Sequence, residues 1–206
     1  MRKTGYVSIF LGVVMILSAM LLYAYNQMEN RQAGESAEAM LQEVQTLLLE
    51  EHPIPQTEEK ISETVVEPEK SESESTTESF QAGYEYIGII ELPDLDLTLP
   101  VLADCNETLL KIAPCRDYGD LETGHLVIAA HNYQNHFGRL YQLEYGADST
   151  RTDMQNVSHQ YTVAEIMTIL PTEVSLVWDS PYELVLYTCD YTNQNRIVVY
   201  CRENGL

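Results

Sequence analysis

Hydrophobic and polar positions divide the chain into three parts. An uncharged, largely apolar run covers about residues 6–25, which at roughly 1.5 Å per residue is long enough to cross a hydrocarbon core of about 30 Å. Glu, Ser, Thr and Gln then dominate residues 29–79, whereas residues 80–206 alternate short apolar runs with turn-forming residues. We therefore expect a transmembrane anchor within residues 1–28, an acidic linker over 29–79, and one compact domain over 80–206.

The residues on either side of the apolar run predict its orientation. Arg2 and Lys3 precede the run and an acidic stretch follows it, a pattern that leaves the N-terminus in the cytoplasm and the rest outside. A cleaved signal peptide is the alternative, but the run is long for that purpose and no clear Ala-x-Ala site follows it. We expect an uncleaved single-pass anchor that holds an extracellular domain at the cell membrane.

Apolar residues recur at helical spacing in the first part of the linker. They are Ala37, Met40, Leu41, Val44, Leu47 and Leu48. This stripe predicts a membrane-proximal amphipathic helix with a self-association or packing face. Residues 58–78 are acidic and poor in apolar side chains, so we expect an extended, self-repelling tether there that provides reach through the cell wall.

Short strands are predicted throughout the last part of the chain. They cover residues 84–92, 95–102, 126–130, 161–169, 184–188 and 197–201, and short helices fit residues 107–112 and 137–143. Many short strands with few helices indicate a mainly β domain that forms a closed or nearly closed barrel.

Charge and cysteine content exclude several functions. The formal net charge of −21 argues against nucleic acid as a partner, because phosphate binding needs clustered Lys and Arg. Carboxylates gather at Asp94 and Asp96, and at Asp117, Asp120 and Glu122, but without a recognisable calcium loop we predict no metal site and no cofactor.

The four cysteines occupy different contexts. Cys105 and Cys115 flank the first short helix and are candidates for a disulfide, whereas Cys201 fits a buried small apolar residue. No Cys-x-x-Cys motif is present, which excludes a thioredoxin-like redox function and a cysteine zinc site.

Cys189 is the candidate nucleophile. It follows the apolar strand 184–188, and Arg196 stands at the start of the next strand after a turn, so a hairpin would bring the two residues face to face. An arginine in that position favours the thiolate and offers N–H donors to an oxyanion.

A histidine is needed to move protons. His131 is the best candidate because it follows the apolar run 126–130, and His136 is the fallback. His125 and His159 flank strands without special context, and His52 lies in the polar linker.

Three segments, LVIAAH with His131, LVLYTC with Cys189 and NRIVV with Arg196, occur in an order that resembles the sortases, the cysteine transpeptidases of Gram-positive cell surfaces. The segment HNYQNHFGRLYQL also resembles the family, and the likeness extends over about residues 84–202. Two departures are small and apolar. Ala130 stands where many relatives have glycine, and Leu-Val-Leu replaces the more usual Thr-Leu opening before the Thr-Cys pair.

The resemblance implies an eight-stranded barrel and a specific reaction. Cys189 would attack the Thr–Gly carbonyl of a secreted protein's C-terminal LPXTG-like sorting signal and form a thioester, while Arg196 stabilises the oxyanion. His131 would protonate the leaving amine and deprotonate an acceptor amine, for example that of a peptidoglycan precursor, which resolves the thioester. Thr188, from the Thr-Cys pair, and Trp178, in the expected specificity loop, are the candidate substrate-binding residues.

Two other classes of protein stay open. Another cysteine hydrolase or an L,D-transpeptidase would use the same thiol chemistry, although the Ser-x-Gly-Cys motif of the latter is absent around Cys189. A non-catalytic adhesion or scaffold module is the second alternative. Since no second apolar span follows the last strand, we expect a wall-anchoring enzyme in preference to one that polymerises pilin. The sortase class, the sorting motif and the acceptor amine are left open.

Overall fold

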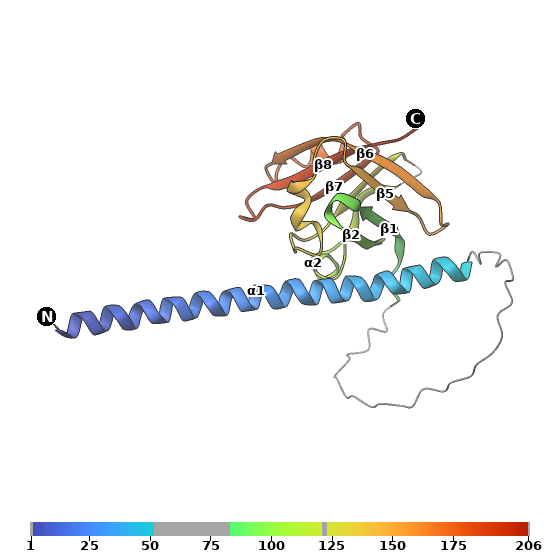
Figure 1. Cartoon of the computed structure of the whole chain (residues 1–206). Coiled ribbons are helices and arrows are strands. Elements are labelled where there is room, and N and C mark those ends of the chain that lie inside the picture. The colour runs from blue at the N-terminus through green and yellow to red at the C-terminus, as the bar shows by residue number, and fades with distance from the viewer. Residues whose placement is uncertain (1, 52–82, 121–122, 206) are drawn as a thin grey trace, which may run out of the picture.

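The computed structural model of the 206-residue chain describes residues 2–51, 83–120 and 123–205. A long helix, α1 (Arg2–Glu51), runs beneath a β-barrel formed by the C-terminal part of the chain (Figure 1). The tether predicted for residues 58–78 lies outside the described residues.

The barrel is closed by eight strands in the order β1-β2-β3-β4-β7-β8-β6-β5. Their bounds are β1 Tyr86–Leu92, β2 Leu97–Leu102, β3 Cys115–Asp120, β4 His125–Ala129, β5 Asp148–Thr152, β6 Ser158–Ile169, β7 Leu184–Cys189 and β8 Arg196–Glu203. Most neighbouring strands are antiparallel. Two pairs are parallel, β2 with β3 and β4 with β7. The mainly β fold and the eight-stranded closed barrel that the sequence and the resemblance predict are therefore confirmed.

Short helices connect the strands. They are the 3-10 turns η1 Pro93–Leu95 and η2 Phe137–Gln142, and the α-helical turns α2 Glu107–Leu110 and α3 Ser175–Trp178. Asn106 caps α2, since its side-chain oxygen accepts hydrogen bonds from the backbone N–H groups of Thr108 and Leu109. Both short helices expected from the sequence are present, and α3 lies within residues 169–178, where the resemblance places the specificity loop.

Alternating residues of the strands build two apolar clusters. Leu126, Ile128, Leu184 and Leu186 belong to the large cluster that also contains Phe137 and fills the barrel. A second cluster on the opposite face of the same strands includes Val127, Val185, Val198 and Tyr200 together with Val177, which α3 contributes. Because side chains alternate between the two faces of a strand, this division distinguishes the inner from the outer face of the barrel.

One face of α1 packs on the barrel. Its buried residues recur at helical spacing and are Ala33, Ala37, Met40, Val44 and Leu48. Met40 contacts the cluster that contains Leu102 and Ala113, and Val44 and Leu48 pack against Ile89. The predicted amphipathic helix is thus present, its stripe contacts the chain's own barrel, and the helix continues without a break from the apolar run.

The structure decides the state of all four cysteines. Cys105 and Cys115 form a disulfide across ten positions of sequence, with their Cα atoms 5.2 Å apart. Cys201 is free and fully buried, and Cys189 is free and half-buried. The disulfide closes the loop that carries α2, and this loop also contacts the cluster around Met40. Cys189 therefore remains available as a nucleophile.

Candidate active site

The three candidate catalytic residues lie on adjacent strand ends. The parallel register pairs Leu126 of β4 with Leu184 of β7, an offset of 58 positions, and the same offset places His131 beside Cys189. On the other side of β7, Cys189 pairs directly with Arg196 of β8. Since neighbouring strands lie about 4.8 Å apart, the position of Cys189 is flanked by that of His131 on one side and that of Arg196 on the other.

All three residues belong to the outer face of the barrel. Cys189 lies two positions after Tyr187, and Arg196 two positions before Val198, both of which pack in the outer cluster. His131 follows Val127 of the same cluster by four positions. The period of two along a strand directs their side chains to the same face. Cys189, His131 and Arg196 are each half-buried, so a substrate can reach the thiol from outside.

Two side-chain hydrogen bonds fix the strand ends to each other. The Thr188 hydroxyl is buried and donates to the Ala130 carbonyl at 2.8 Å. The Asn132 amide donates to the Asp190 carbonyl at 3.0 Å. These bonds join the residues on either side of Cys189 to the residues on either side of His131, and they define the spacing of thiol and imidazole.

The turn between β7 and β8 is organised by the Asp190 carboxylate. It accepts hydrogen bonds from the Thr192 hydroxyl, the Gln194 backbone N–H and the Asn195 amide. Desolvation opposes the charged form, but the hydrogen bonds from Asn195, Thr192 and Gln194 outweigh it and lower the pKa of Asp190 to about 2. The charged carboxylate therefore holds the turn in the shape that delivers Arg196 opposite Cys189.

His131 lies among aromatic and charged side chains from three elements. Its ring centroid is 5.0 Å from that of Tyr133. Burial lowers the pKa of His131 below its ordinary 6.5, and Lys111 lowers it further, while Glu29 and Glu107 act in the opposite direction. Lys111 and Glu107 come from the loop closed by the disulfide, and Glu29 comes from α1. The imidazole is thus held ready to accept a proton at neutral pH.

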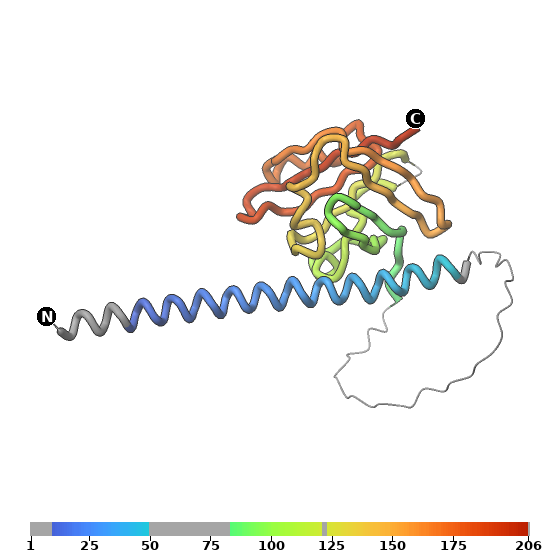
Figure 2. The backbone as a smooth tube through the Cα atoms, in the orientation of Figure 1, coloured from blue at the N-terminus to red at the C-terminus, as the bar shows by residue number. Residues whose placement is uncertain are grey.

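A pocket of about 850 Å³ opens over Cys189. Helix α1 supplies Asn26, Glu29 and Asn30 to its wall, and the other lining residues come from the barrel: Asn132, Tyr133, Gln134, Gly138, Tyr141, Thr168, Cys189, Asp190, Tyr191, Asn193 and Ile197. The β7–β8 turn lies at the end of the barrel that faces the N-terminal half of α1 (Figure 2).

Gly138 is required where the pocket wall approaches the chain after His131. A Cβ at this position would collide with the carbonyl oxygens of Asn132 and Tyr133. The Gly138 N–H also donates to the Tyr133 carbonyl at 2.9 Å. The Phe-Gly pair therefore folds η2 back against the histidine loop.

Trp178 lies apart from this pocket. It stacks on Tyr118 with ring centroids 5.1 Å apart, and its indole N–H donates to Asp117 at 2.9 Å. These residues line a second hollow of about 1010 Å³ that does not include Cys189. Tyr187 precedes Cys189 by two positions on the outer face. Burial and the Asp117 carboxylate raise the pKa of Tyr187. Because Asp117 lines the second hollow, this hollow adjoins the strand that carries the thiol. A substrate contact by Trp178 or Thr188 stays a prediction.

The other described histidines make structural contacts. His136, the fallback candidate, is fully buried and its Nε2 lies 3.3 Å from the Ala33 carbonyl of α1. His125 contacts the Tyr182 carbonyl at 2.6 Å, and His159 contacts Glu203 at 2.9 Å. His52 lies outside the described residues. Of the four described histidines, only His131 is in register with Cys189.

Sequence reasoning missed the contribution of α1 to the pocket. Asn26 and Asn30 extend the stripe of Ala33 and Ala37 toward the N-terminus at the same helical spacing. Glu29 is the first charged residue after Lys3. The helical spacing of the two asparagines and the isolated charge of Glu29 are both visible in the sequence. Only the contact between α1 and the barrel shows that these three residues line the pocket.

The barrel carries a free cysteine on its outer face, with a histidine and an arginine on the neighbouring strand ends. This arrangement is that of an enzyme with a cysteine nucleophile. Comparison at the family level matches residues 90–204, more than half of the chain, to the sortase domain. The chain therefore belongs to the sortase family and is a cysteine transpeptidase, a class of cell-surface enzyme that uses sorting signals and amine acceptors as its substrates.

Solved sortase structures share the fold. Sortase A from Corynebacterium diphtheriae, a lid mutant, is 22% identical with a TM-score of 0.53, and the match covers 62% of this chain and 75% of that one. Sortase C1 from Streptococcus suis is 23% identical with a TM-score of 0.51, covering 60% and 75%. A Clostridium perfringens sortase D5 transpeptidase is 17% identical with a TM-score of 0.51, covering 58% and 79%. Comparison with curated proteins gives no match.

Proposed function

We propose that Cys189, His131 and Arg196 carry out transpeptidation on an LPXTG-like sorting signal. The observation that carries this proposal is the strand register, which sets Cys189 between His131 and Arg196 on one face. In the first step the Cys189 sulfur attacks the Thr–Gly carbonyl and the C–N bond breaks. His131 takes the proton of the Cys189 thiol and gives it to the departing amine, and the product is a thioester on Cys189.

Arg196 supports both steps by stabilising negative charge. Its guanidinium carries fixed N–H donors, and Nη1 donates at 3.3 Å to the Asn195 carbonyl, within the turn organised by Asp190. The carbonyl oxygen of the substrate becomes negative in each tetrahedral intermediate, and a preorganised cation beside Cys189 lowers the energy of that state. In the second step an acceptor amine attacks the thioester, His131 takes up a proton, and the C–S bond breaks.

The proposed location is the outer surface of a membrane, with α1 as the single-pass anchor. Among the described residues, α1 is the one helix long and apolar enough to cross a membrane. Its large apolar side chains from Phe10 to Tyr25 are exposed. A lipid environment would bury this surface, and Arg2 with Lys3 would hold the N-terminus inside. The peptidoglycan precursor is the proposed source of the acceptor amine.

Intact-mass analysis tests the reaction. The full chain in lipid nanodiscs is incubated with a panel of LPXTG-like peptides, with and without an amine. We expect an acyl adduct on the wild type that the amine removes, and none on Cys189→Ala. His131→Ala should slow turnover by about 10²- to 10⁴-fold, and Arg196→Lys by about 10²- to 10³-fold. An adduct on Cys189→Ala, or no adduct on a wild type with a free thiol, would contradict the proposal.

A further inference from the structure

Helix α1 is bound directly to the loop that follows the proposed catalytic histidine. The Asn30 side-chain oxygen accepts a hydrogen bond from the Gln134 backbone N–H at 3.0 Å. The Asn30 carbonyl accepts one from the Asn135 amide at 3.4 Å. A Cβ on Gly34 would collide with the Asn135 side chain as it is placed here, so Asn135 lies directly against α1 at this glycine. Helix α1 therefore forms part of the pocket wall through specific contacts.

Glu29 gives this wall a negative charge. Its carboxylate accepts a hydrogen bond from the Tyr25 hydroxyl at 2.9 Å and acts electrostatically on both His131 and Tyr133. Among the described residues that line the pocket, the other charged side chain is Asp190, which is occupied by its own turn, and none is Lys or Arg. The part of the pocket that α1 lines thus offers a carboxylate, whereas Arg196 pairs with Cys189 from the β8 side.

We propose that Glu29 forms the acceptor subsite and receives the primary ammonium group of the incoming nucleophile. The inference rests on the proposed transpeptidase function and adds the chemistry of the second substrate. A lysine-type amine has a pKa of about 10.4 and is therefore a cation at neutral pH. A carboxylate in the pocket wall attracts this cation and holds its nitrogen close to the thioester.

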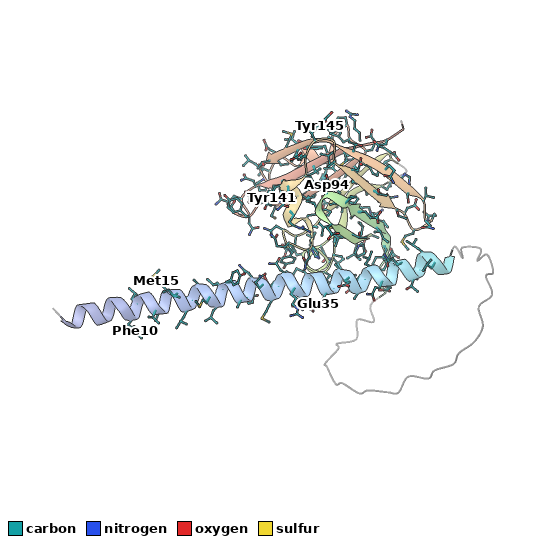
Figure 3. The ribbon with its side chains drawn as sticks, in the orientation of Figure 1. Phe10, Met15, Glu35, Asp94, Tyr141 and Tyr145 are labelled. Carbon is teal, nitrogen blue, oxygen red and sulfur yellow. A yellow bond between two sulfur atoms is a disulfide. The ribbon has the colours of Figure 1, made fainter. Side chains whose placement is uncertain are left out.

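The position of Glu29 in the chain places the subsite at the membrane surface. Residues 4–28 carry no charge, and Glu29 comes directly after them. In Figure 3, Phe10 and Met15 lie on the part of α1 that extends beyond the barrel, whereas Glu35 lies where the helix runs beneath it. Glu29 lies between these two parts. An amine carried by a soluble molecule or by a membrane lipid could therefore reach the same carboxylate.

The subsite fits a balanced second step. The ammonium gives one proton to the neutral His131 imidazole, and the resulting amine attacks the thioester carbonyl. The C–S bond then breaks as the amide bond forms, and a second proton from the nitrogen goes to the Cys189 sulfur. One ammonium, one imidazole and one thioester become one amide, one imidazolium and one thiol, so atoms and charge are conserved. Glu29 does not exchange a proton and acts as a positioning residue.

Two nucleophiles of different charge test the subsite. The full chain in lipid nanodiscs is first acylated with a sorting peptide and then given either Nα-acetyl-lysine amide, a cation, or hydroxylamine, which is largely uncharged at neutral pH. Glu29→Gln should raise the KM for Nα-acetyl-lysine amide roughly tenfold or more and leave the KM for hydroxylamine unchanged. Glu29→Asp, which keeps the carboxylate, should stay close to the wild type for both.

Glu38→Gln is the matched control, because it makes the same change on an exposed position of the same helix and should leave both KM values unchanged. An equal rise in both KM values for Glu29→Gln would show that Glu29 has only a structural role in the pocket wall and would overturn the subsite. An unchanged KM for Nα-acetyl-lysine amide would overturn it as well. If the subsite is overturned but Glu29→Gln still forms the acyl adduct normally, the proposed transpeptidation stands. No adduct on the wild type would overturn both proposals.

Nanodiscs that contain phosphatidylethanolamine identify the source of the amine. Transfer to this lipid that depends on Glu29 would support a subsite for a membrane-borne acceptor. Transfer to the soluble amine alone, with the same dependence on Glu29, would support a subsite for a soluble acceptor.

Discussion

Two side-chain hydrogen bonds join the strand ends that carry His131 and Cys189, and neither donor is itself reactive. Thr188 donates to the Ala130 carbonyl and Asn132 to the Asp190 carbonyl. The sequence singled out Thr188 because it precedes the nucleophile, but its buried hydroxyl is used between β7 and β4. Such contacts are invisible in a single sequence, because the partners lie 58 positions apart.

His136 predicts a pH-dependent stability. Burial, and to a lesser extent His131, lowers its pKa from 6.5 to about 4, although the Ala33 carbonyl opposes this shift. The unfolded chain binds a proton as the pH falls through 6.5, whereas the folded chain resists it until about 4. Stability is therefore fully present above 6.5 and falls by roughly 3 kcal/mol as the pH drops to 4.

Denaturant unfolding between these pH values checks this expectation. His136→Gln, which keeps an N–H for the Ala33 carbonyl but has no titratable group, should lose less stability over the same range. Equal pH dependence of the two proteins would show that other groups are responsible.

At the scale of whole elements, two strands escaped the sequence analysis. β3 has the sequence CRDYGD and β5 the sequence DSTRT, and neither shows the apolar alternation of a typical strand. Both form because neighbouring strands provide backbone partners: β3 pairs with β4, and β5 pairs with β1 and β6. The barrel supplies hydrogen bonds that outweigh weak local preference.

Helix α1 should detach from the barrel when its buried stripe is interrupted. Val44 is fully buried against Ile89, so Val44→Asp would place a charge in an apolar contact. We expect the backbone amides of α1 between residues 30 and 48 to exchange hydrogen faster, because an undocked helix loses its tertiary support. Amine transfer should also decrease, since the pocket loses the wall that α1 supplies.

Leu49→Asp provides the comparison, because Leu49 lies on the same helix and is 59% exposed. It should leave both hydrogen exchange and amine transfer close to the wild type. Rapid exchange in the Leu49 variant alone would show that the helix is held by a different face.

At the scale of the whole molecule, α1 connects two requirements of the enzyme. The same uninterrupted helix carries the exposed apolar surface and one wall of the pocket. From the sequence we expected these roles to divide at residue 28, with a tether further along the chain, which lies outside the described residues. Docking of the barrel on α1 fixes the height of Cys189 relative to the proposed membrane.

The docking predicts which end of the barrel faces the lipid. Tyr191 borders the pocket at the turn next to α1, and Tyr145 lies on the side of the barrel away from α1 (Figure 3). Their exposed fractions are 94% and 83%, so both positions accept a label. In a Cys189→Ala background, a fluorophore on Tyr191→Cys should transfer more energy to acceptor-labelled lipid headgroups than one on Tyr145→Cys. Equal or reversed transfer would contradict the docked arrangement.

The sequence by itself determined the features that depend on local pattern. The apolar run, the stripe from Ala37 to Leu48 and the order of His131, Cys189 and Arg196 all follow from residue type and spacing, and spacing also made Cys105 and Cys115 candidates for a disulfide. Each is encoded within a short window, where periodicity and chemistry suffice.

Only the tertiary structure decided which of these parts meet. It brought His131, and not His136, into register with Cys189, joined the strand ends through Thr188, and brought Glu29 of α1 to the pocket of Cys189. These contacts connect residues separated by 58 to more than 100 positions. Chain closure over such separations depends on the burial of whole faces, which local periodicity does not encode.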